Sequence, residues 1–204
     1  VNVTFEGDAR NTTVVYNLME RPPRDIRFGA GYNDSLGVFA TINVQDVNFG
    51  GLGQRLGGTV LVGTRDIQFD GRFVSPYRDT EPNVPGYNAN VFRRRGLSVV
   101  FDDEVRLPNG DRAREQKYGA NIGLEKPIGA GWMGNWGLSY TNVSIRDNGG
   151  QVSPVDELGN SLTLSGTGVD DLVSFTFSAV KDLRDYALNP SIGSLARFDT
   201  EQYL

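Results

Sequence analysis

Apolar residues recur at every second position along most of this chain. Between residues 38 and 45 the even positions carry valine, alanine or isoleucine, and polar residues such as Thr41 and Asn43 lie between them. Strict alternation is typical of a β-strand whose two faces meet different environments. Residues 26–32 alternate in the same way, and Asn33-Asp34-Ser35 is a turn sequence. The stretch from residue 26 to residue 46 therefore predicts two strands joined by a tight turn.

The same alternating unit recurs down the chain between turn-forming residues. Further strands are predicted at residues 55–63, 67–73, 87–95, 118–125, 136–141 and 173–179, and a last strand begins at Ser194. The predicted connections are residues 48–54, 64–66, 76–85, 96–115, 127–134, 146–169 and 181–193. Two of them, 96–115 and 146–169, are expected to be long polar loops.

A shorter hairpin precedes this array. Its strands are predicted at residues 1–5 and 12–19, with a turn around residues 7–11. Tandem prolines at Pro22-Pro23 then fix the backbone dihedral φ and remove backbone donors, which breaks regular structure. We place a domain boundary there, so the prediction is two units, residues 1–22 and residues 23–204.

The two faces of the predicted strands differ in size as well as in polarity. One face is apolar and aromatic, and the other carries mostly glycine, serine, threonine, asparagine and glutamine. A soluble barrel needs bulky apolar residues inside to fill its core, and the second face cannot supply them. The pattern favours an all-β, antiparallel transmembrane β-barrel, with its apolar face toward lipid and its polar face toward a watery lumen. Trp132, Trp136 and Tyr140 suit an aromatic girdle at the membrane interface.

Composition removes several classes of chemistry. The 204 residues include no Cys and no His, which excludes disulfides, histidine-based catalysis, cysteine nucleophiles and the usual zinc ligand sets. A formal net charge of -5 argues against nucleic acid as a partner. No run approaches the ~18 apolar residues of a membrane-spanning helix, but a barrel strand needs only about ten alternating residues.

Several motifs that could carry chemistry have simpler interpretations. Gly50-Gly51-Leu52-Gly53 lacks the following helix and the Lys-Ser/Thr pair of a phosphate-binding loop, so it is predicted to be a turn. Asp102-Asp103-Glu104 lacks the spacing of a calcium loop, and Asp170-Asp171 has no neighbouring base or metal ligand. Arg93-Arg94-Arg95 is typical of a strand end that meets lipid phosphates. No catalytic constellation is found, and the prediction is a protein that is not an enzyme and uses no cofactor and no metal.

Short segments along the chain resemble a known family, the BamA-type outer-membrane protein assembly factors, including their cyanobacterial and chloroplast-envelope relatives. Residues 14–22 (VVYNLMERP) resemble the last strand of a polypeptide-transport-associated (POTRA) domain, and residues 26–32 (IRFGAGY) resemble the first barrel strand after it. Residues 46–54, 73–77 and 189–194 resemble the first periplasmic turn, the end of the fourth strand and the turn before the ninth strand. The family's barrel has about twice as many strands as this chain predicts. The resemblance therefore implies the first half of the barrel, of eight to nine strands, preceded by the terminal hairpin of a POTRA domain.

The resemblance also implies a function: part of an insertase or translocase in a bacterial outer membrane, cyanobacteria included, or in the plastid envelope. The implied partners are the lipid bilayer, unfolded outer-membrane β-barrel clients, and accessory assembly proteins bound through POTRA domains. An incoming strand would pair with the backbone of the first barrel strand by β-augmentation. This gate strand comprises Ile26, Arg27, Phe28, Gly29, Ala30, Gly31, Tyr32 and Asn33. Because Gly29 and Gly31 supply little side-chain packing, we expect its seam to be loose.

Two alternatives stay open. About eight strands can close by themselves in a membrane, so a passive small outer-membrane barrel, structural or a narrow pore, is the second hypothesis. A soluble β-barrel that binds a small ligand is the third, and the small polar residues of the second face disfavour it. The hairpin before Pro22 favours the assembly factor, because a plain small barrel has no use for it.

Overall fold

The computed structural model describes residues 2–7, 12–17, 22–33, 36–98, 101 and 105–204. Parts of three predictions lie outside these residues. They are the turn and the end of the second strand in the first hairpin (residues 8–11, 18 and 19), the turn residues Asp34 and Ser35, and the acidic segment Asp102–Glu104. In the described part of the chain, no helix is long and apolar enough to cross a membrane.

The strands form two separate sheets. β1 (Asn2–Gly7) and β2 (Thr12–Asn17) pair as an antiparallel hairpin. The other nine strands form one antiparallel sheet in chain order, from β3 to β11. Their bounds are β3 (Arg24–Asn33), β4 (Gly37–Phe49), β5 (Gln54–Gly63), β6 (Ile67–Ser75), β7 (Gly86–Leu97), β8 (Arg114–Gly129), β9 (Trp132–Arg146), β10 (Val169–Asp182) and β11 (Leu195–Tyr203). The predicted all-β antiparallel architecture is therefore confirmed.

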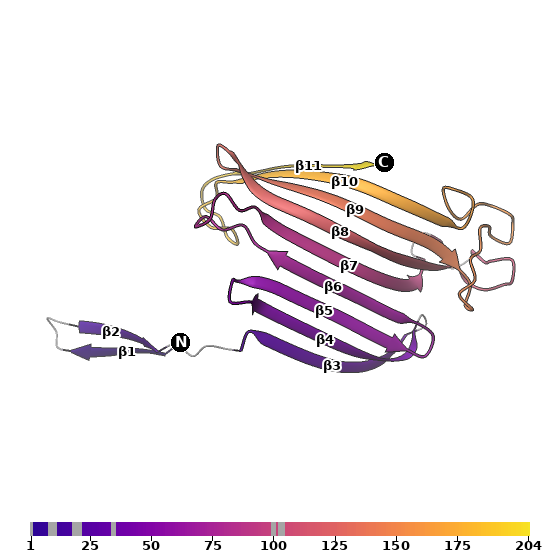
Figure 1. Cartoon of the computed structure of the whole chain (residues 1–204), viewed down its shortest axis with the longest axis horizontal. Coiled ribbons are helices and arrows are strands. Elements are labelled where there is room, and N and C mark those ends of the chain that lie inside the picture. Colours follow the sequence, from indigo (N-terminus) through magenta and orange to yellow (C-terminus); the bar gives the residue numbers. More distant parts are fainter. Residues whose placement is uncertain (1, 8–11, 18–21, 34–35, 99–100, 102–104) are drawn as a thin grey trace.

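The large sheet is a meander in which every strand lies beside its neighbour in the sequence (Figure 1). Two short turns and two longer loops, residues 76–85 and 183–194, connect the strands at the end where β3 begins, which we call the hairpin end. At the opposite end, which we call the long-loop end, residues 98–113 and 147–168 connect the strands. Within the described residues, β1 and β2 contact each other and not the nine-stranded sheet.

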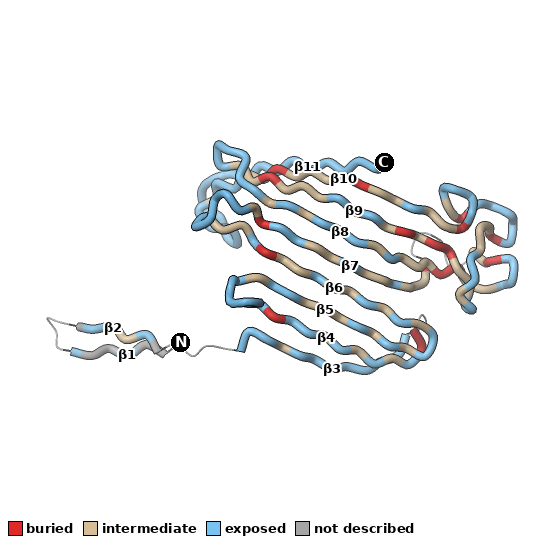
Figure 2. Tube along the Cα trace, viewed as in Figure 1, coloured by how far each residue is buried: buried red, intermediate tan, exposed pale blue. Residues whose placement is uncertain are grey.

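The registers place all the alternating apolar positions on one face of this sheet. Ile42 of β4, for example, lies between Phe28 of β3 and Val60 of β5, and Val60 is followed by Phe69 of β6. All four side chains are exposed. Buried residues are few and lie mainly near the strand ends and in the long loops (Figure 2). The sheet thus has an uncovered apolar face instead of a core between layers.

Aromatic rings mark both ends of this apolar face. Near the hairpin end, aromatic rings pair with centroids 5.6–6.5 Å apart: Phe49–Phe73, Phe73–Tyr87, Trp136–Phe177 and Phe177–Phe198. The first pair joins β4 to β6 across β5, and the other three join neighbouring strands. Nearer the long-loop end, Tyr118 and Tyr140 lie on the same face. On β9, Trp132 and Tyr140 are eight residues apart, or about 27 Å at roughly 3.4 Å per residue. Because the strands of membrane barrels are tilted by about 35–45°, this distance is a rise of roughly 20 Å, somewhat less than the ~25 Å apolar band that aromatic girdles flank.

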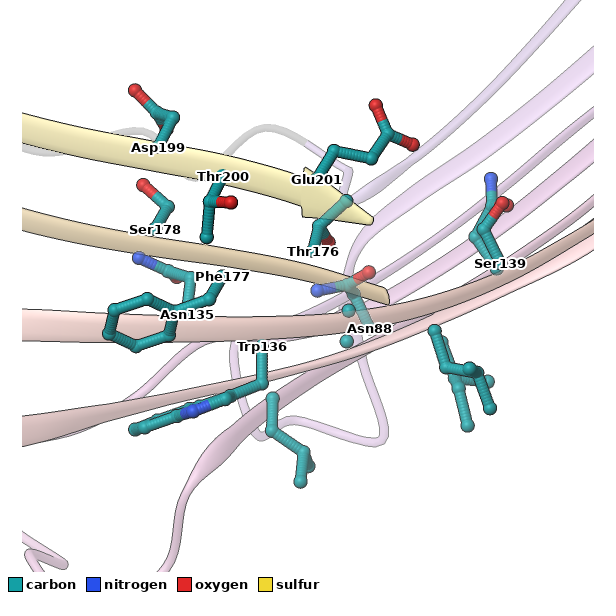
Figure 3. Close-up of a pocket in the computed structure, with 16 residues that line it drawn as sticks. Asn88, Asn135, Trp136, Ser139, Thr176, Phe177, Ser178, Asp199, Thr200 and Glu201 are labelled. Atoms are coloured by element: carbon teal, nitrogen blue, oxygen red, sulfur yellow. The ribbon is translucent and has the colours of Figure 1, made fainter. Parts of the chain in front are cut away.

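The opposite face is polar and hollowed. Cross-strand hydrogen bonds run along it, from Asn43 Nδ2 to Thr59 Oγ1 (2.7 Å) and from Asn121 Nδ2 to Asn90 Oδ1 (3.3 Å). A cavity of about 570 Å³ lies over β7 to β11, where Asp199 and Glu201 project to the opposite side of β11 from Thr200 (Figure 3). The small side chains of this face leave open space, as the sequence predicts for a lumen.

One predicted turn is wrong in its bounds. Residues 127–134 are expected to be a turn, but β8 continues to Gly129 and β9 begins at Trp132. The connection is only Ala130-Gly131, and both residues have positive φ (51° and 77°), as a two-residue hairpin turn requires. Pro127 is accommodated because it lies at a register shift in the ladder, where a bulge relaxes the hydrogen bonding.

The two long loops are more ordered than a polar loop implies. Leu107, Ala113, Ile145 and Leu162 form a buried cluster at the long-loop end, and Phe101 and Val105 pack against it. Asp156 caps this structure by accepting hydrogen bonds from the backbone N–H groups of Leu158 and Asn160. A hydrogen bond from the Asn160 side chain helps hold the pKa of Asp156 below its usual value. The loops therefore form a small folded cap beyond the strands.

Candidate strand-pairing edge

The predicted gate strand lies at one edge of the sheet. β3 pairs with β4 along its whole length, from Arg24↔Asp46 to Asn33↔Gly37. In the described part of the chain, the other side of β3 has no strand beside it. β11, at the opposite edge, likewise pairs only with β10. The nine strands therefore form an open sheet with two edges.

One hydrogen bond fixes which backbone groups of β3 point toward β4. The Val47 N–H donates to the Pro23 carbonyl at 2.9 Å, so residues 23 and 47 are a hydrogen-bonded pair. Hydrogen-bonded pairs alternate along an antiparallel ladder. Odd-numbered residues of β3, such as Gly29, therefore bond to β4. The N–H and C=O groups of the even-numbered residues Ile26, Phe28, Ala30 and Tyr32 point toward the open edge.

The side chains of those even-numbered residues lie on the apolar face. Phe28 is 76 % exposed, and Ile26 and Tyr32 are also exposed. The open edge thus presents unpaired backbone groups next to an uncovered apolar row. Both are features that a second β-strand in a membrane can satisfy.

The two glycines of β3 permit a close approach of β4 side chains on the polar face. A Cβ atom at Gly29 would lie 2.8 Å from Thr41 Cγ2, and one at Gly31 would lie 2.9 Å from Phe39 Cζ. Both distances are shorter than real Cβ contacts. The glycines therefore let Thr41 and Phe39 lie over β3, and β3 contributes no side chain of its own there.

Both ends of the β3–β4 hairpin are fastened. At the hairpin end, Arg24 Nε donates to Asp46 Oδ2 at 2.8 Å, and the other oxygen of Asp46 accepts the Asn48 N–H at 2.9 Å. At the long-loop end, Asn33 Oδ1 accepts the Leu36 N–H at 2.7 Å. Side-chain hydrogen bonds thus reinforce the pairing of β3 with β4 at both ends of the hairpin.

The motifs that the sequence analysis set aside lie in structural positions. Residues 50–53 form a turn with positive φ at Gly50, Gly51 and Gly53, and β5 follows, as predicted. Asp170 accepts backbone hydrogen bonds from Leu164 and Ser165. Among the described residues, no group of three or more His, Cys, Asp or Glu could hold a metal ion.

The sequence pattern predicts a strand at residues 26–33 but not which of its backbone groups bond to β4. Alternation of side chains shows which residues share a face. It does not show which of the two alternating sets bonds to β4. That information comes from the Pro23–Val47 hydrogen bond, which a sequence pattern does not encode.

An antiparallel sheet with an uncovered apolar face, a hollowed polar face and aromatic rows at its ends is the wall of a transmembrane β-barrel. The fold defines this class of protein. The family follows from a sequence comparison: the model of the Omp85 superfamily domain matches residues 48–204. The chain belongs to the Omp85 superfamily, and it is part of an outer-membrane-type β-barrel.

Known proteins that resemble the chain include one plant protein and one bacterial protein. "Outer envelope protein 80, chloroplastic" of Oryza sativa subsp. japonica is 24 % identical over 176 residues, which cover 81 % of this chain and 26 % of that protein. The crystal structure of BamA from Haemophilus ducreyi lacking POTRA domains 1–3 covers 100 % of this chain, with a TM-score of 0.53 and 19 % identity. The match spans 39 % of that BamA chain. The chain therefore spans less than half the length of either protein, and the structural likeness supports the fold alone.

Proposed function

We propose that this chain is the N-terminal half of an outer-membrane barrel that inserts or translocates other membrane proteins. Membership of the Omp85 superfamily supports the general class. The observation that carries the specific proposal is the open edge of β3, where alternate backbone groups have no partner strand among the described residues. In this proposal, a client strand pairs with Ile26–Asn33 and is thereby positioned for membrane insertion.

The unpaired backbone groups of β3 lie beside apolar side chains, which supports pairing within the membrane. Unsatisfied N–H and C=O groups cost several kcal/mol each in hydrocarbon, so an edge at membrane depth favours any strand that can pair with it. The even-numbered residues that offer these groups also carry the apolar side chains Ile26, Phe28 and Tyr32. A client strand paired there would continue the apolar face of the sheet into the bilayer.

We further propose that residues 1–22 are the end of a POTRA domain and that residues 23–204 belong to the barrel. The separate β1–β2 hairpin supports this division. The clients would be unfolded outer-membrane barrels, with accessory assembly proteins bound through the POTRA domains. The location of the relative named above supports a plastid outer envelope, and that of BamA a bacterial outer membrane.

A passive small barrel fits the strand arrangement less well. In an antiparallel meander of nine strands, the first and last strands run in the same direction. Bacterial single-chain barrels have an even number of strands, because their closing pair is then antiparallel. Direct closure of β3 on β11 would need a parallel seam instead. The arrangement therefore favours a sheet whose edges pair with other strands.

Proline substitution in the full-length protein tests the proposal. Ala30→Pro removes an N–H that points toward the open edge, so the barrel should still fold and keep its heat-modifiable gel migration. Client barrels in the outer membrane should fall severalfold, because pairing with β3 is interrupted. Undiminished client levels with Ala30→Pro would mean that templating by residues 26–33 is not how the protein works.

Ala40→Pro is the matched control. Ala40 lies directly opposite Ala30 on the same face, and both residues are exposed alanines. Its N–H points toward β5, because the Thr64 N–H donates to the Val38 carbonyl and sets the phase of that ladder. Ala40→Pro should therefore damage the barrel itself and abolish heat-modifiable migration.

A further inference from the structure

A cavity at the long-loop end brings three arginines together outside the strand-pairing edge. It measures about 260 Å³ and is lined by Arg65, Arg95, Arg114 and Asn148. Arg65 belongs to the turn between β5 and β6, Arg95 to β7 and Arg114 to the start of β8. Arginines up to about fifty positions apart in the sequence thus line one space.

Two of these arginines are held firmly in place. Arg95 Nη2 donates to the Asp147 carbonyl at 2.8 Å, and its Nε is enclosed, with no hydrogen-bond partner among the described residues. Arg114 is only 8 % exposed, and its Nε donates to Asn148 Oδ1 at 2.7 Å. Holding the guanidinium groups in advance lowers the entropy cost of binding a ligand between them.

The nearby carboxylates are engaged by other groups. Asp111 accepts hydrogen bonds from both the backbone N–H and the side-chain amide of Asn148. Asp147 accepts hydrogen bonds from the Gln151 N–H and the Asn109 amide. These contacts hold the turn at residues 147–150 over the strand ends, beside the cavity.

The cavity lies at the long-loop end, on the same face of the sheet as the apolar residues that meet lipid. Arg95 pairs with Gln116 and Arg114 with Leu97, so both arginines share a face with Tyr118. Arg114 is four residues beyond Tyr118, or about 13 Å along the strand. The strands of membrane barrels are tilted by about 35–45°, so the rise above the aromatic girdle is roughly 10 Å. Lipid phosphates lie just outside the apolar layer, at such a level.

We infer that this cavity binds the phosphate of an anionic lipid in the outer leaflet. Guanidinium groups bind phosphate through paired, charge-assisted hydrogen bonds, and three arginines line this one cavity. A free phosphate ion has the same chemistry. The lipid is the proposed occupant because Arg95 and Arg114 lie on the lipid-facing side, beyond the aromatic girdle. The inference needs the chain to span a membrane but does not depend on strand pairing at β3.

Lipid retention by the full-length protein tests the inference. The protein is placed in nanodiscs of phosphatidylcholine with a minor share of phosphatidic acid, and the lipids that remain bound after release are counted by native mass spectrometry. The unsubstituted protein should retain phosphatidic acid in excess of its share. In the double variant Arg65→Gln/Arg95→Gln the enrichment of phosphatidic acid should be about tenfold lower, as expected when charge-assisted hydrogen bonds are removed.

Arg94→Gln is the matched control, because Arg94 is the neighbour of Arg95 but lies on the polar face, where it pairs with Asp70. It should leave the enrichment unchanged, and an equal loss would overturn the site in favour of general charge attraction. Inorganic phosphate is also added at the same concentration as phosphatidic acid. If the protein then retains phosphate equally well and loses all the bound lipid, the lipid is not the occupant. Should the double variant fail to fold, Arg65→Gln alone decides, since Arg65 lies in an exposed turn. It should lower the enrichment in the same direction, and no change would contradict the inference.

Discussion

The two edges of the sheet differ in which residues point their backbone N–H and C=O groups outward. On β3, the groups at the open edge belong to the even-numbered residues, whose side chains lie on the apolar face. On β11, the Leu204 N–H donates to the Val173 carbonyl, so even-numbered residues bond to β10 and odd-numbered residues point outward. These odd-numbered residues include Arg197, Asp199 and Glu201, whose side chains lie on the polar face.

This difference changes what a partner strand meets at each edge. Next to β3, its backbone pairs beside apolar side chains in the lipid layer. Next to β11, its backbone pairs beside charged residues, including the Arg197–Asp199 ion pair with Nε–Oδ2 at 2.6 Å. Charged residues are one way in which proteins restrict pairing at a sheet edge. We therefore expect β3 to accept clients and β11 to pair with one fixed neighbour.

The largest expected effect concerns the apolar row of β3. Phe28→Arg places a charge near the middle of the strand on the lipid-facing side, which should cost about 2–4 kcal/mol of folding free energy. Thr41→Arg is the control at matched depth, since Thr41 lies on the polar face opposite Gly29. Urea unfolding in lipid vesicles measures both. A loss at Thr41 equal to that at Phe28 would mean that the faces are assigned the wrong way round.

A second effect separates the edges by their backbone. In the full-length protein, Glu201→Pro should cost about 1–3 kcal/mol, the usual penalty for a buried carbonyl left without its donor, because a fixed neighbour is expected beside β11. Ala30→Pro should cost much less. Thr200→Pro should be damaging in either case, since its N–H bonds to β10. Unfolding midpoints in urea measure all three, and tolerance of Glu201→Pro would show that β11 has no strand beside it.

The faces, order and number of barrel strands could be predicted because alternation is a local property of the sequence. Val38, Ile42 and Val60 share one face of the sheet, as alternation predicts, since lipid and lumen impose different demands on adjacent positions. The bounds of β8 and β9 could not be predicted as well. Pro127 suggested an early turn, whereas the bulge in that ladder tolerates it.

The cap at the long-loop end was not predicted at all. Its apolar members, such as Leu107, Ile145 and Leu162, are far apart in the sequence and follow no period, so no local pattern joins them. The arginine cavity is hidden for the same reason. Arg93-Arg94-Arg95 is predicted to be a strand end near lipid phosphates, but only the structure brings Arg65, Arg95 and Arg114 together around one cavity.

A smaller effect concerns the glycines of β3, a residue type that β11 lacks. Gly31→Ala places a methyl group against the Phe39 ring and should cost about 1 kcal/mol, the lower end of the range for overpacking. Gly58→Ala is the control, because its nearest neighbour would be the Asp70 carbonyl oxygen at an ordinary 3.7 Å. It should be neutral. If Gly31→Ala/Phe39→Leu does not recover the loss seen with Gly31→Ala in urea, the close approach of the ring is not the cause.

The smallest effect concerns the turn that leads into β11. Asp185 Oδ1 accepts hydrogen bonds from the backbone N–H groups of Ile192 and Ser191, and these lower its pKa from the usual value of about 3.9. A depressed pKa in the folded state means that the carboxylate stabilises the turn above about pH 3.9. That contribution is lost as the pH falls through the lower, folded-state pKa. Hydrogen exchange of residues 183–194, corrected for the intrinsic rate, should therefore rise over this acidic range. Asp185→Asn should raise exchange already at neutral pH and flatten the acidic rise, while exchange in β3 stays unchanged. An acidic rise of full size in Asp185→Asn would place the titrating group elsewhere.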